Sequence, residues 1–153
     1  MAGRETPATL ALREAGVAYE LREYEHDPAA GSYALEAAEA LRLDPDTVFK
    51  TLVVDRDGTL TACLVLSGSQ LDARALGKRV ALAAPHRAEK VTGYVTGGIS
   101  PFGQRRPLPT LVDETVEILD TVWVSGGRRG LEIGPAPGDL VAQLGAEVLA
   151  IAR

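Results

Sequence analysis

Two glycine-rich segments in the second half of the sequence have the residue types of a ligand site. They are residues 93–109, GYVTGGISPFGQRRPLP, and residues 124–134, VSGGRRGLEIG. Glycine lets the backbone approach a ligand closely and direct N–H groups at it. Each segment also holds two arginines, which are Arg105 and Arg106 in the first and Arg128 and Arg129 in the second. This combination predicts a pocket for an anionic or carbonyl-bearing ligand.

Neither segment places a serine or cysteine in the setting of an enzymatic nucleophile. Ser125 precedes two glycines, but a serine elbow needs Gly-x-Ser-x-Gly, and Trp123 occupies the first glycine position. We therefore interpret Ser125 as a hydroxyl donor or turn former. Cys63 lies within the apolar run TACLVL and is expected to pack as a small buried hydrophobe.

The sequence also lacks the spacing of metal and nucleotide sites. His26, His86 and Cys63 are its only soft ligands, and neither CxxC nor HExxH occurs. Neither glycine-rich segment matches GxxxxGK[ST], and no GxGxxG opens a helix after the first predicted strand. We expect no metal and no cofactor.

Lys50 interrupts an apolar run, VFKTLVV, that begins at Val48. Strand alternation places its side chain with Leu52, on the face opposite Phe49 and Thr51. An inward lysine is costly unless it is paired or faces a ligand cavity. An edge-strand lysine that reaches water explains the pattern equally well, so both interpretations stay open.

The composition is that of a globular protein with a local rather than a global binding surface. Hydrophobic residues make up 46% of the 153 residues and charged residues 24%, which is ordinary for one domain covering residues 1–153. The net charge of -5 argues against broad, nonspecific binding to nucleic acid. No signal peptide or membrane span is apparent, so we expect a cytoplasmic location and no membrane partner.

Periodicity and turn residues predict more strands than helices. Helices are expected from Thr6–Pro7 to a stop at Gly16, from Ser32 to Leu41, and over residues 85–91 and 137–144, with a short one inside residues 67–79. Strands are expected at residues 19–24, 48–54, 60–66, 110–112, 121–124, 130–133 and 148–151. Residues 48–54 and 60–66 form a hairpin around Asp57-Gly58. The fold class is α+β, with a mixed sheet and a barrel-like core.

Several motifs resemble the YbaK/EbsC family of trans-editing aminoacyl-tRNA deacylases, which are related to the insertion domain of bacterial prolyl-tRNA synthetase. The resemblance is close to the Cys-tRNA(Pro) deacylase branch and covers nearly the whole chain. GGISPxGQ followed by VSGGxRGLxI is specific, whereas FKTL alone is not. The motifs are YEHDP (24–28), FKTL (49–52), TGY (92–94), GGISPFGQ (97–104), LPTLVDE (108–114), VSGGRRGLEI (124–133) and GDL (138–140).

The resemblance implies a mixed β-sheet that forms a pseudo-barrel with surrounding helices. It also implies an essential catalytic lysine at Lys50 and an aromatic wall supplied by Tyr33. Glu132 stands where the family often has Asp. From the residues alone, Tyr24 is interpreted as a half-buried packing tyrosine, whereas the resemblance places it in the pocket. The substrate-binding residues that we expect are Tyr24, Thr51, Gly97, Gly98, Ile99, Ser100, Pro101, Ser125, Gly126 and Glu132.

The activity implied is hydrolysis of the ester between cysteine and the 3′ end of tRNA(Pro), the partner being its acceptor end. The substrate's own thiol would attack the ester, which accounts for the missing protein nucleophile. N–H groups around Gly98, Ile99 and Ser100 would stabilise the oxyanion. Lys50 would contact either that oxygen or the terminal ribose-phosphate. Prolyl-tRNA synthetase is a further possible partner because the acidic chain selects tRNA weakly.

Three alternatives stay open at this level. A deacylase for alanine or another small amino acid would use water as the nucleophile. A non-catalytic module would bind tRNA or a synthetase without turnover. An unspecific small-ester hydrolase would cleave esters that lack the adenosine end.

Overall fold

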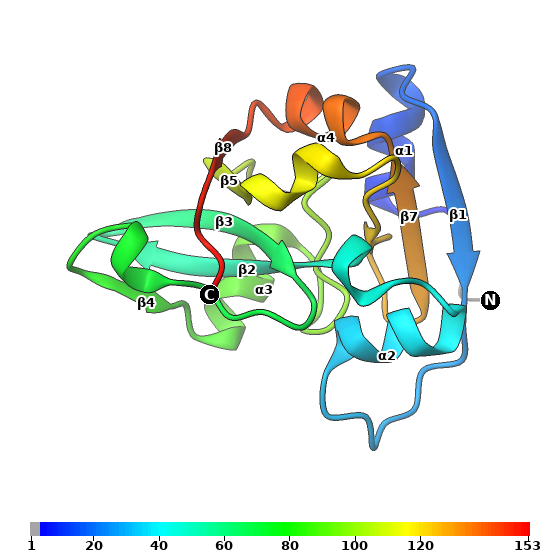
Figure 1. Ribbon diagram of the computed structural model, residues 1–153, viewed down its shortest axis with the longest axis horizontal. Helices are drawn as coiled ribbons and strands as arrows, with labels where there is room; N and C mark the ends of the chain where they lie inside the picture. The colour runs from blue at the N-terminus through cyan, green and yellow to red at the C-terminus, as the bar shows by residue number, and fades with distance from the viewer. Residues whose placement is uncertain (1–3) are drawn as a thin grey trace.

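The computed structural model describes residues 4–153, which contain four α-helices and eight strands (Figure 1). The helices are α1 (Pro7–Glu14), α2 (Tyr33–Leu41), α3 (Pro85–Thr92) and α4 (Pro137–Leu144). The strands are β1 (Tyr19–Glu23), β2 (Phe49–Arg56), β3 (Thr59–Leu66), β4 (Val80–Leu82), β5 (Thr110–Asp113), β6 (Val124–Ser125), β7 (Leu131–Pro135) and β8 (Glu147–Leu149). Short 3₁₀ turns cover Pro45–Thr47, Ala73–Ala75 and Glu114–Ile118.

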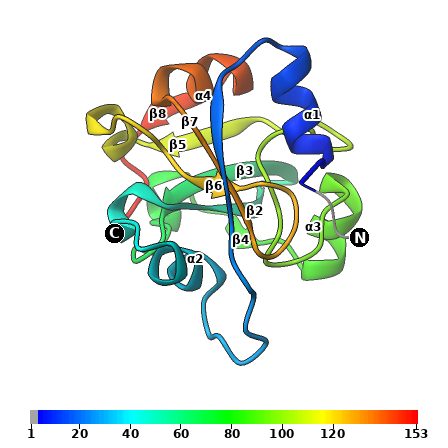
Figure 2. The ribbon, with the colours of Figure 1, turned by 90° about the vertical axis from the view of Figure 1, so that its right-hand side faces the viewer.

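The strands form two sheets, and the α+β class predicted from the sequence is confirmed. The smaller sheet has the order β1-β7-β6 and is antiparallel throughout. The larger sheet has the order β4-β2-β3-β5-β8, in which β5 runs parallel to both β3 and β8. In the two views of the ribbon, α1 and α4 lie at one end of the molecule and α2 at the other (Figure 1, Figure 2).

The two sheets are joined at one point beside the start of β2. Val48 and Trp123 form a parallel bridge there. The N–H of Phe49 donates to the carbonyl of Trp123, and the N–H of Trp123 donates to the carbonyl of Thr47, both at 2.8 Å. This junction makes a continuous, bent β-structure out of the two sheets, as expected for a pseudo-barrel.

The β2–β3 hairpin is confirmed, and its register sets the orientation of Lys50. Lys50 pairs with Val65, and Asp57 and Gly58 form the turn with φ values of 51° and 91°. A two-residue turn with positive φ at both positions matches the twist of a hairpin, which is why Asp-Gly predicts it. Gly58 donates its N–H to the carboxylate of Asp55 at 2.7 Å.

The hydrophobic core lies on both faces of the larger sheet. One face packs Phe49, Leu64 and Val112 against Ile133 of the smaller sheet. The opposite face buries Cys63 with Val54, Val65 and Ile151. Because β2 and β3 are covered on both sides, their apolar runs are continuous rather than strictly alternating.

Two strands differ from the sequence-based expectation. β4 was not predicted, because its three residues, Val80–Leu82, are too few to show an alternating pattern; it is held by pairing with Arg56 and the two residues before it. The strand predicted over residues 121–124 is shorter and shifted, covering only Val124–Ser125. Gly126 then bonds back to Leu131, which closes the turn between β6 and β7.

Candidate active site

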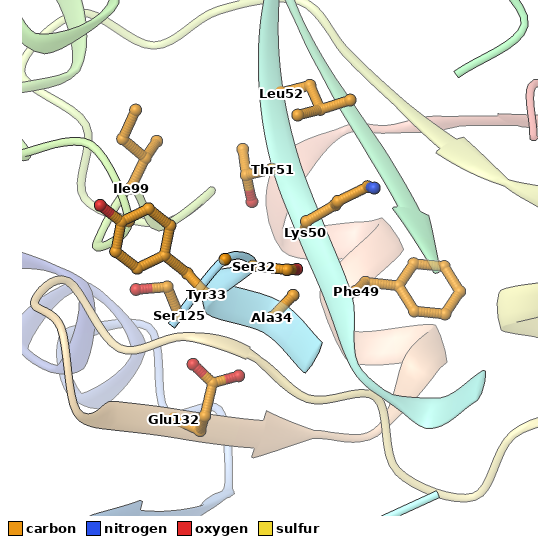
Figure 3. Close-up of a pocket in the computed structure, with 12 residues that line it drawn as sticks. Ser32, Tyr33, Ala34, Phe49, Lys50, Thr51, Leu52, Ile99, Ser125 and Glu132 are labelled. Atoms are coloured by element: carbon orange, nitrogen blue, oxygen red, sulfur yellow. The ribbon is translucent and has the colours of Figure 1, made fainter. Parts of the chain in front are cut away.

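A cavity of about 230 Å³ lies where the N-terminus of α2, the first half of β2 and the two glycine-rich segments meet (Figure 3). Pockets for drug-sized ligands measure about 300–1,000 Å³, so this one accommodates a group of amino-acid size. Its lining residues are Gly31, Ser32, Tyr33, Ala34, Phe49, Lys50, Thr51, Leu52, Gly97, Ile99, Ser125 and Glu132.

The two glycine-rich segments pack directly on each other at one wall of this cavity. A Cβ atom on Gly98 would lie 2.8 Å from the backbone of Arg128, so only glycine allows this approach. Thr6, which caps the N-terminus of α1, donates its hydroxyl to the carbonyl of Gly126 and holds the second segment from behind. The loops therefore form one rigid wall.

Two backbone N–H groups in the first segment are free to bind a ligand. Within residues 4–153, the N–H groups of Gly97 and Ile99 donate to no protein acceptor, and both residues line the cavity. The N–H of Gly98 donates to the carbonyl of Val95 at 2.9 Å, and Ser100 is fully buried. Gly97 and Ile99 are therefore the candidate oxyanion donors of this segment, whereas the sequence analysis expected the N–H groups around Gly98, Ile99 and Ser100.

Lys50 lines the cavity, but its ammonium group is directed away from the glycine-rich segments. Lys50 and Leu52 extend to one side of β2 and Thr51 to the other, as strand alternation predicts (Figure 3). Nζ lies 3.5 Å from the carbonyl oxygen of Ser67 at the end of β3. Partial burial lowers the pKa of Lys50 below its usual value. The cation is thus placed beside the cavity rather than at its centre.

Glu132 is the acidic group of the cavity. Only 6% of the residue is exposed, and burial raises the pKa of its carboxyl to about 8. Within residues 4–153 it forms no hydrogen bond or ion pair. Its neighbours in the sheet are Arg22 on β1 and Ser125 on β6.

The hydroxyl groups in the cavity lack the partners of an activated nucleophile. Ser32 accepts a hydrogen bond from the N–H of Leu35, and Ser125 accepts one from the N–H of Gly127 at 3.2 Å. The hydroxyl of Thr51 is buried and has no hydrogen-bond partner in the described chain. Within residues 4–153 none of the three is hydrogen-bonded to a histidine or a carboxylate, whereas an activated serine or threonine needs a base within hydrogen-bond reach. The arrangement can bind and polarise an ester but supplies no attacking group.

Comparison with known proteins decides the family. The aminoacyl-tRNA editing domain family matches residues 27–141 of this chain. The chain belongs to the aminoacyl-tRNA editing domain family. The resemblance to the YbaK/EbsC proteins inferred from the motifs is thereby confirmed, and the activity of the chain is deacylation of aminoacyl-tRNA.

Individual relatives agree with this assignment. A protein of Enterococcus faecalis (strain ATCC 700802 / V583), provisionally named as the Cys-tRNA(Pro)/Cys-tRNA(Cys) deacylase EbsC, is 33% identical over 123 residues, which are 76% of this chain and 75% of that protein. A crystal structure provisionally described as a trans-editing enzyme for prolyl-tRNA synthetase is 27% identical with a TM-score of 0.85, covering 100% of this chain and 99% of that one. The hypothetical protein APE2540 shares the fold at 24% identity, with a TM-score of 0.84 over 97% of this chain and 100% of that one.

The editing domain brings six of the expected site residues to the cavity and leaves five outside its lining. Those in the lining are Lys50, Thr51, Gly97, Ile99, Ser125 and Glu132. Gly98 and Gly126 support the wall by close packing, and Ser100 and Pro101 are buried behind it. Burial, helped by the nearby carboxyl of Glu132, raises the pKa of Tyr24 to about 12.

The arginine pairs of the two segments do not form the predicted anion pocket. Arg105 and Arg106 are exposed and do not line the cavity. Arg128 pairs with Glu23 at 2.9 Å. Arg129 donates to the carbonyl of Thr96 and lies 5.3 Å from the ring centre of Tyr33, so it supports the cavity wall from outside. Arg128 and Arg129 are engaged in structural contacts that sequence spacing does not reveal.

The sequence analysis missed the contribution of α2 to the editing domain's cavity, apart from Tyr33. Ser32 caps α2 and was recognised as a helix start, but its place in the lining was not. Gly31 and Ala34 are ordinary loop and helix residues in the sequence, and no motif distinguishes them. Phe49 and Leu52 belong to the FKTL motif, but they were not expected in the lining. Residues 4–153 contain no cluster of three or more metal-ligating side chains. No helix in this range has the length and apolar character that crossing a membrane requires.

Proposed function

We propose that this chain removes cysteine from mischarged Cys-tRNA(Pro), with the thiol of the bound cysteine as the nucleophile. The observation that carries the proposal is a small cavity that has free backbone N–H donors and no activated protein nucleophile in its lining. The name of the Enterococcus relative and the motif pattern support cysteine and tRNA(Pro) as the substrate.

The chemical step needs only groups that the substrate and the cavity supply. The cysteine Sγ attacks its own ester carbonyl, a C–S bond forms and the C–O bond to the ribose breaks. The ribose oxygen leaves with the thiol proton, and water then opens the thiolactone. We expect the developing oxyanion to accept hydrogen bonds from the N–H groups of Gly97 and Ile99, and one such donor lowers a barrier by roughly 3–4 kcal/mol. A thiol suits this role because it is intrinsically more nucleophilic than a hydroxyl.

We assign Lys50 to the terminal ribose-phosphate rather than to the oxyanion. Its ammonium group is on the side of β2 away from Ser125 and Glu132, which supports contact with a charge at the edge of the cavity (Figure 3). Its lowered pKa reflects burial without an anionic partner, and a phosphate would supply that partner.

The decisive experiment compares substrates that differ only in the group on the β-carbon of the amino acid. Wild-type protein is given tRNA(Pro) charged with cysteine, S-methylcysteine, serine or alanine, and ester loss is followed. Rapid loss of cysteine alone supports the thiol mechanism. Equal loss of alanine or S-methylcysteine overturns it and assigns the attack to water. Binding of tRNA with no loss of any of the four contradicts deacylation itself.

Selection of tRNA(Pro) is proposed to depend on prolyl-tRNA synthetase. The net charge of -5 gives a weak electrostatic attraction to RNA. Deacylation is therefore expected to be faster and more selective for tRNA(Pro) when the synthetase is added. Tight, selective binding of tRNA(Pro) by the isolated protein contradicts this dependence.

A further inference from the structure

Two polar groups in the cavity have no partner in the protein. Glu132 is 6% exposed and forms no hydrogen bond or ion pair within residues 4–153. Thr51 Oγ1 is buried and makes no hydrogen bond in the same range. Buried polar side chains are normally hydrogen-bonded, and an exception needs an explanation. Both residues line one cavity, so a bound ligand is the simplest explanation.

The two groups approach the cavity from different sheets. Thr51 extends from β2 on the side away from Lys50, and Glu132 extends from β7 with its carboxyl group toward Ser125 and Tyr33 (Figure 3). The backbone bridge between Val48 and Trp123 joins the two sheets beside the start of β2. A small group placed between Thr51 and Glu132 would meet a hydroxyl on one side and a carboxyl on the other.

No cation of the described chain neutralises Glu132. Its sheet neighbour Arg22 donates to Glu20 and lies 5.4 Å from the ring centre of Trp123. The ammonium of Lys50 is on the other side of β2 (Figure 3). Tyr24 lies near Glu132, and burial together with the carboxyls of Glu132 and Glu36 raises the pKa of its phenol to about 12, so Tyr24 brings no positive charge.

The ligand chemistry that fits is a primary ammonium. A carboxylate offers only acceptors and a hydroxyl offers acceptor lone pairs, so the matching group brings several N–H donors and a positive charge. An aminoacyl ester has such a group on the carbon next to the carbonyl. When the carbonyl oxygen lies at Gly97 and Ile99, the amino group lies within the same small cavity as Thr51 and Glu132.

We propose that Thr51 and Glu132 form the subsite for the free α-amino group of the aminoacyl ester, so that substrates with a blocked amino group are rejected. This inference rests on the proposed deacylase function. The neutral carboxyl of Glu132 gives up its proton when the ammonium binds, and the proton passes to solvent. Formyl-aminoacyl-tRNA and peptidyl-tRNA have an amide nitrogen in place of the amine, so the subsite protects them from cleavage.

Binding of a non-hydrolysable probe tests the subsite separately from chemistry. The probe is 3′-deoxy-3′-(L-alanylamido)adenosine, and its N-acetyl derivative is the matched compound. The free amine is expected to bind wild-type protein at least about tenfold more tightly, the usual weight of a charge-assisted hydrogen bond. Calorimetry at pH 7 in two buffers of different ionisation enthalpy is expected to show proton release with the free amine only.

Three variants complete the test. Glu132→Gln is expected to remove most of the preference for the free amine, and Thr51→Val to reduce it severalfold. Glu117→Gln, an exposed carboxylate in the 3₁₀ turn Glu114–Ile118, is the control and keeps the wild-type ratio. Thermal unfolding distinguishes a binding role from a structural one, because the side chains of Thr51 and Glu132 have no hydrogen bond within residues 4–153 to lose, so the melting temperature stays equal or rises.

Specific outcomes overturn the inference. Equal affinity of wild-type protein for the two probes overturns it. An unchanged ratio of the two affinities in Glu132→Gln also overturns it. A Glu132→Gln protein that keeps the ratio but loses deacylation assigns the carboxyl to the chemical step instead. If Cys-tRNA(Pro) is cleaved while the probes bind equally, the subsite is wrong and the deacylase function stands. If no ester is cleaved and neither probe binds, both the subsite and the deacylase function are wrong.

Discussion

The ring of Tyr33 lies directly against Gly97, so that a Cβ atom on Gly97 would be 2.5 Å from two ring carbons. Gly97 also has a φ of +88°, which favours glycine. The contact joins α2 to the first glycine-rich segment, and Arg129 and His26 lie near the same ring at 5.3 and 5.5 Å. The aromatic side chain thus fixes the segment that presents the free N–H groups.

Gly97→Ala is expected to lower stability by at least about 1–3 kcal/mol, because the residue is strained at positive φ and its methyl group displaces Tyr33. Deacylation is expected to fall together with it. Thermal unfolding and initial rates measure both effects. Gly138→Ala is the matched control, since Gly138 has open space around it and lies in α4, where alanine is favoured by about 0.5–1 kcal/mol. Equal behaviour of the two variants contradicts the role of the Tyr33 contact.

Lys50→Ala is expected to lower the rate of Cys-tRNA(Pro) deacylation by at least about a hundredfold, because loss of the proposed contact with the terminal ribose-phosphate misplaces the ester. Stability changes little because the ammonium makes a single long contact with Ser67. Lys78→Ala, which removes an exposed lysine of the same charge, keeps the wild-type rate. A Lys50→Ala protein with normal turnover excludes the proposed role.

Cys63→Ala is expected to keep its activity per folded molecule. Cys63 is fully buried in the core on the face of the larger sheet opposite Thr51, and burial raises the pKa of its thiol to about 11. The smaller side chain leaves a void that lowers stability by about 1–2 kcal/mol. Urea unfolding and single-turnover rates of the same preparation give the two numbers. Loss of turnover in well-folded Cys63→Ala protein refutes the proposal that the substrate thiol, and not the thiol of Cys63, is the nucleophile.

Glu132→Gln is expected to stabilise the protein progressively as the pH rises. The folded-state pKa of about 8 exceeds the ordinary value of 4.5, so the folded protein keeps a proton that the unfolded chain releases. Below pH 4.5 both states keep the proton, so Glu132 does not destabilise the wild type. Between pH 4.5 and 8 the free energy of unfolding of the wild type falls as the pH rises. The difference in melting temperature between the variant and wild type should grow over that window. Glu117→Gln is the control, and a pH-independent difference for Glu132→Gln contradicts a neutral carboxyl.

The fold could be predicted largely from local signals. Asp57-Gly58 predicted the hairpin, and Thr6 followed by Pro7 predicted the start of α1. Both features depend on the backbone preferences of a few residues. β4 was missed because Val80–Leu82 is a strand only through its pairing with β2. Local propensity contains no information on such a partner.

In the candidate site, too, local sequence patterns predicted some positions, and tertiary contacts determined the others. Lys50 and Thr51 were placed on opposite faces of β2 by alternation alone. The arginine pairs were assigned wrongly, because sequence spacing does not show that Arg129 bonds Thr96 or that Arg128 pairs with Glu23. Tyr33 was assigned to the wall through the family resemblance, and its contact with Gly97 required the three-dimensional structure.

The pairing of β1 with β7 brings Tyr19 opposite Pro135, across most of the chain. Glu132 lies within this pairing, so its position in the cavity depends on contacts that no shorter stretch of polypeptide can form. Pairings of such long range are slow and form late in folding. During translation, β7 must therefore leave the ribosome before the chain can deacylate tRNA. Truncated polypeptides that end before residue 131 are expected to have no deacylase activity on charged tRNA.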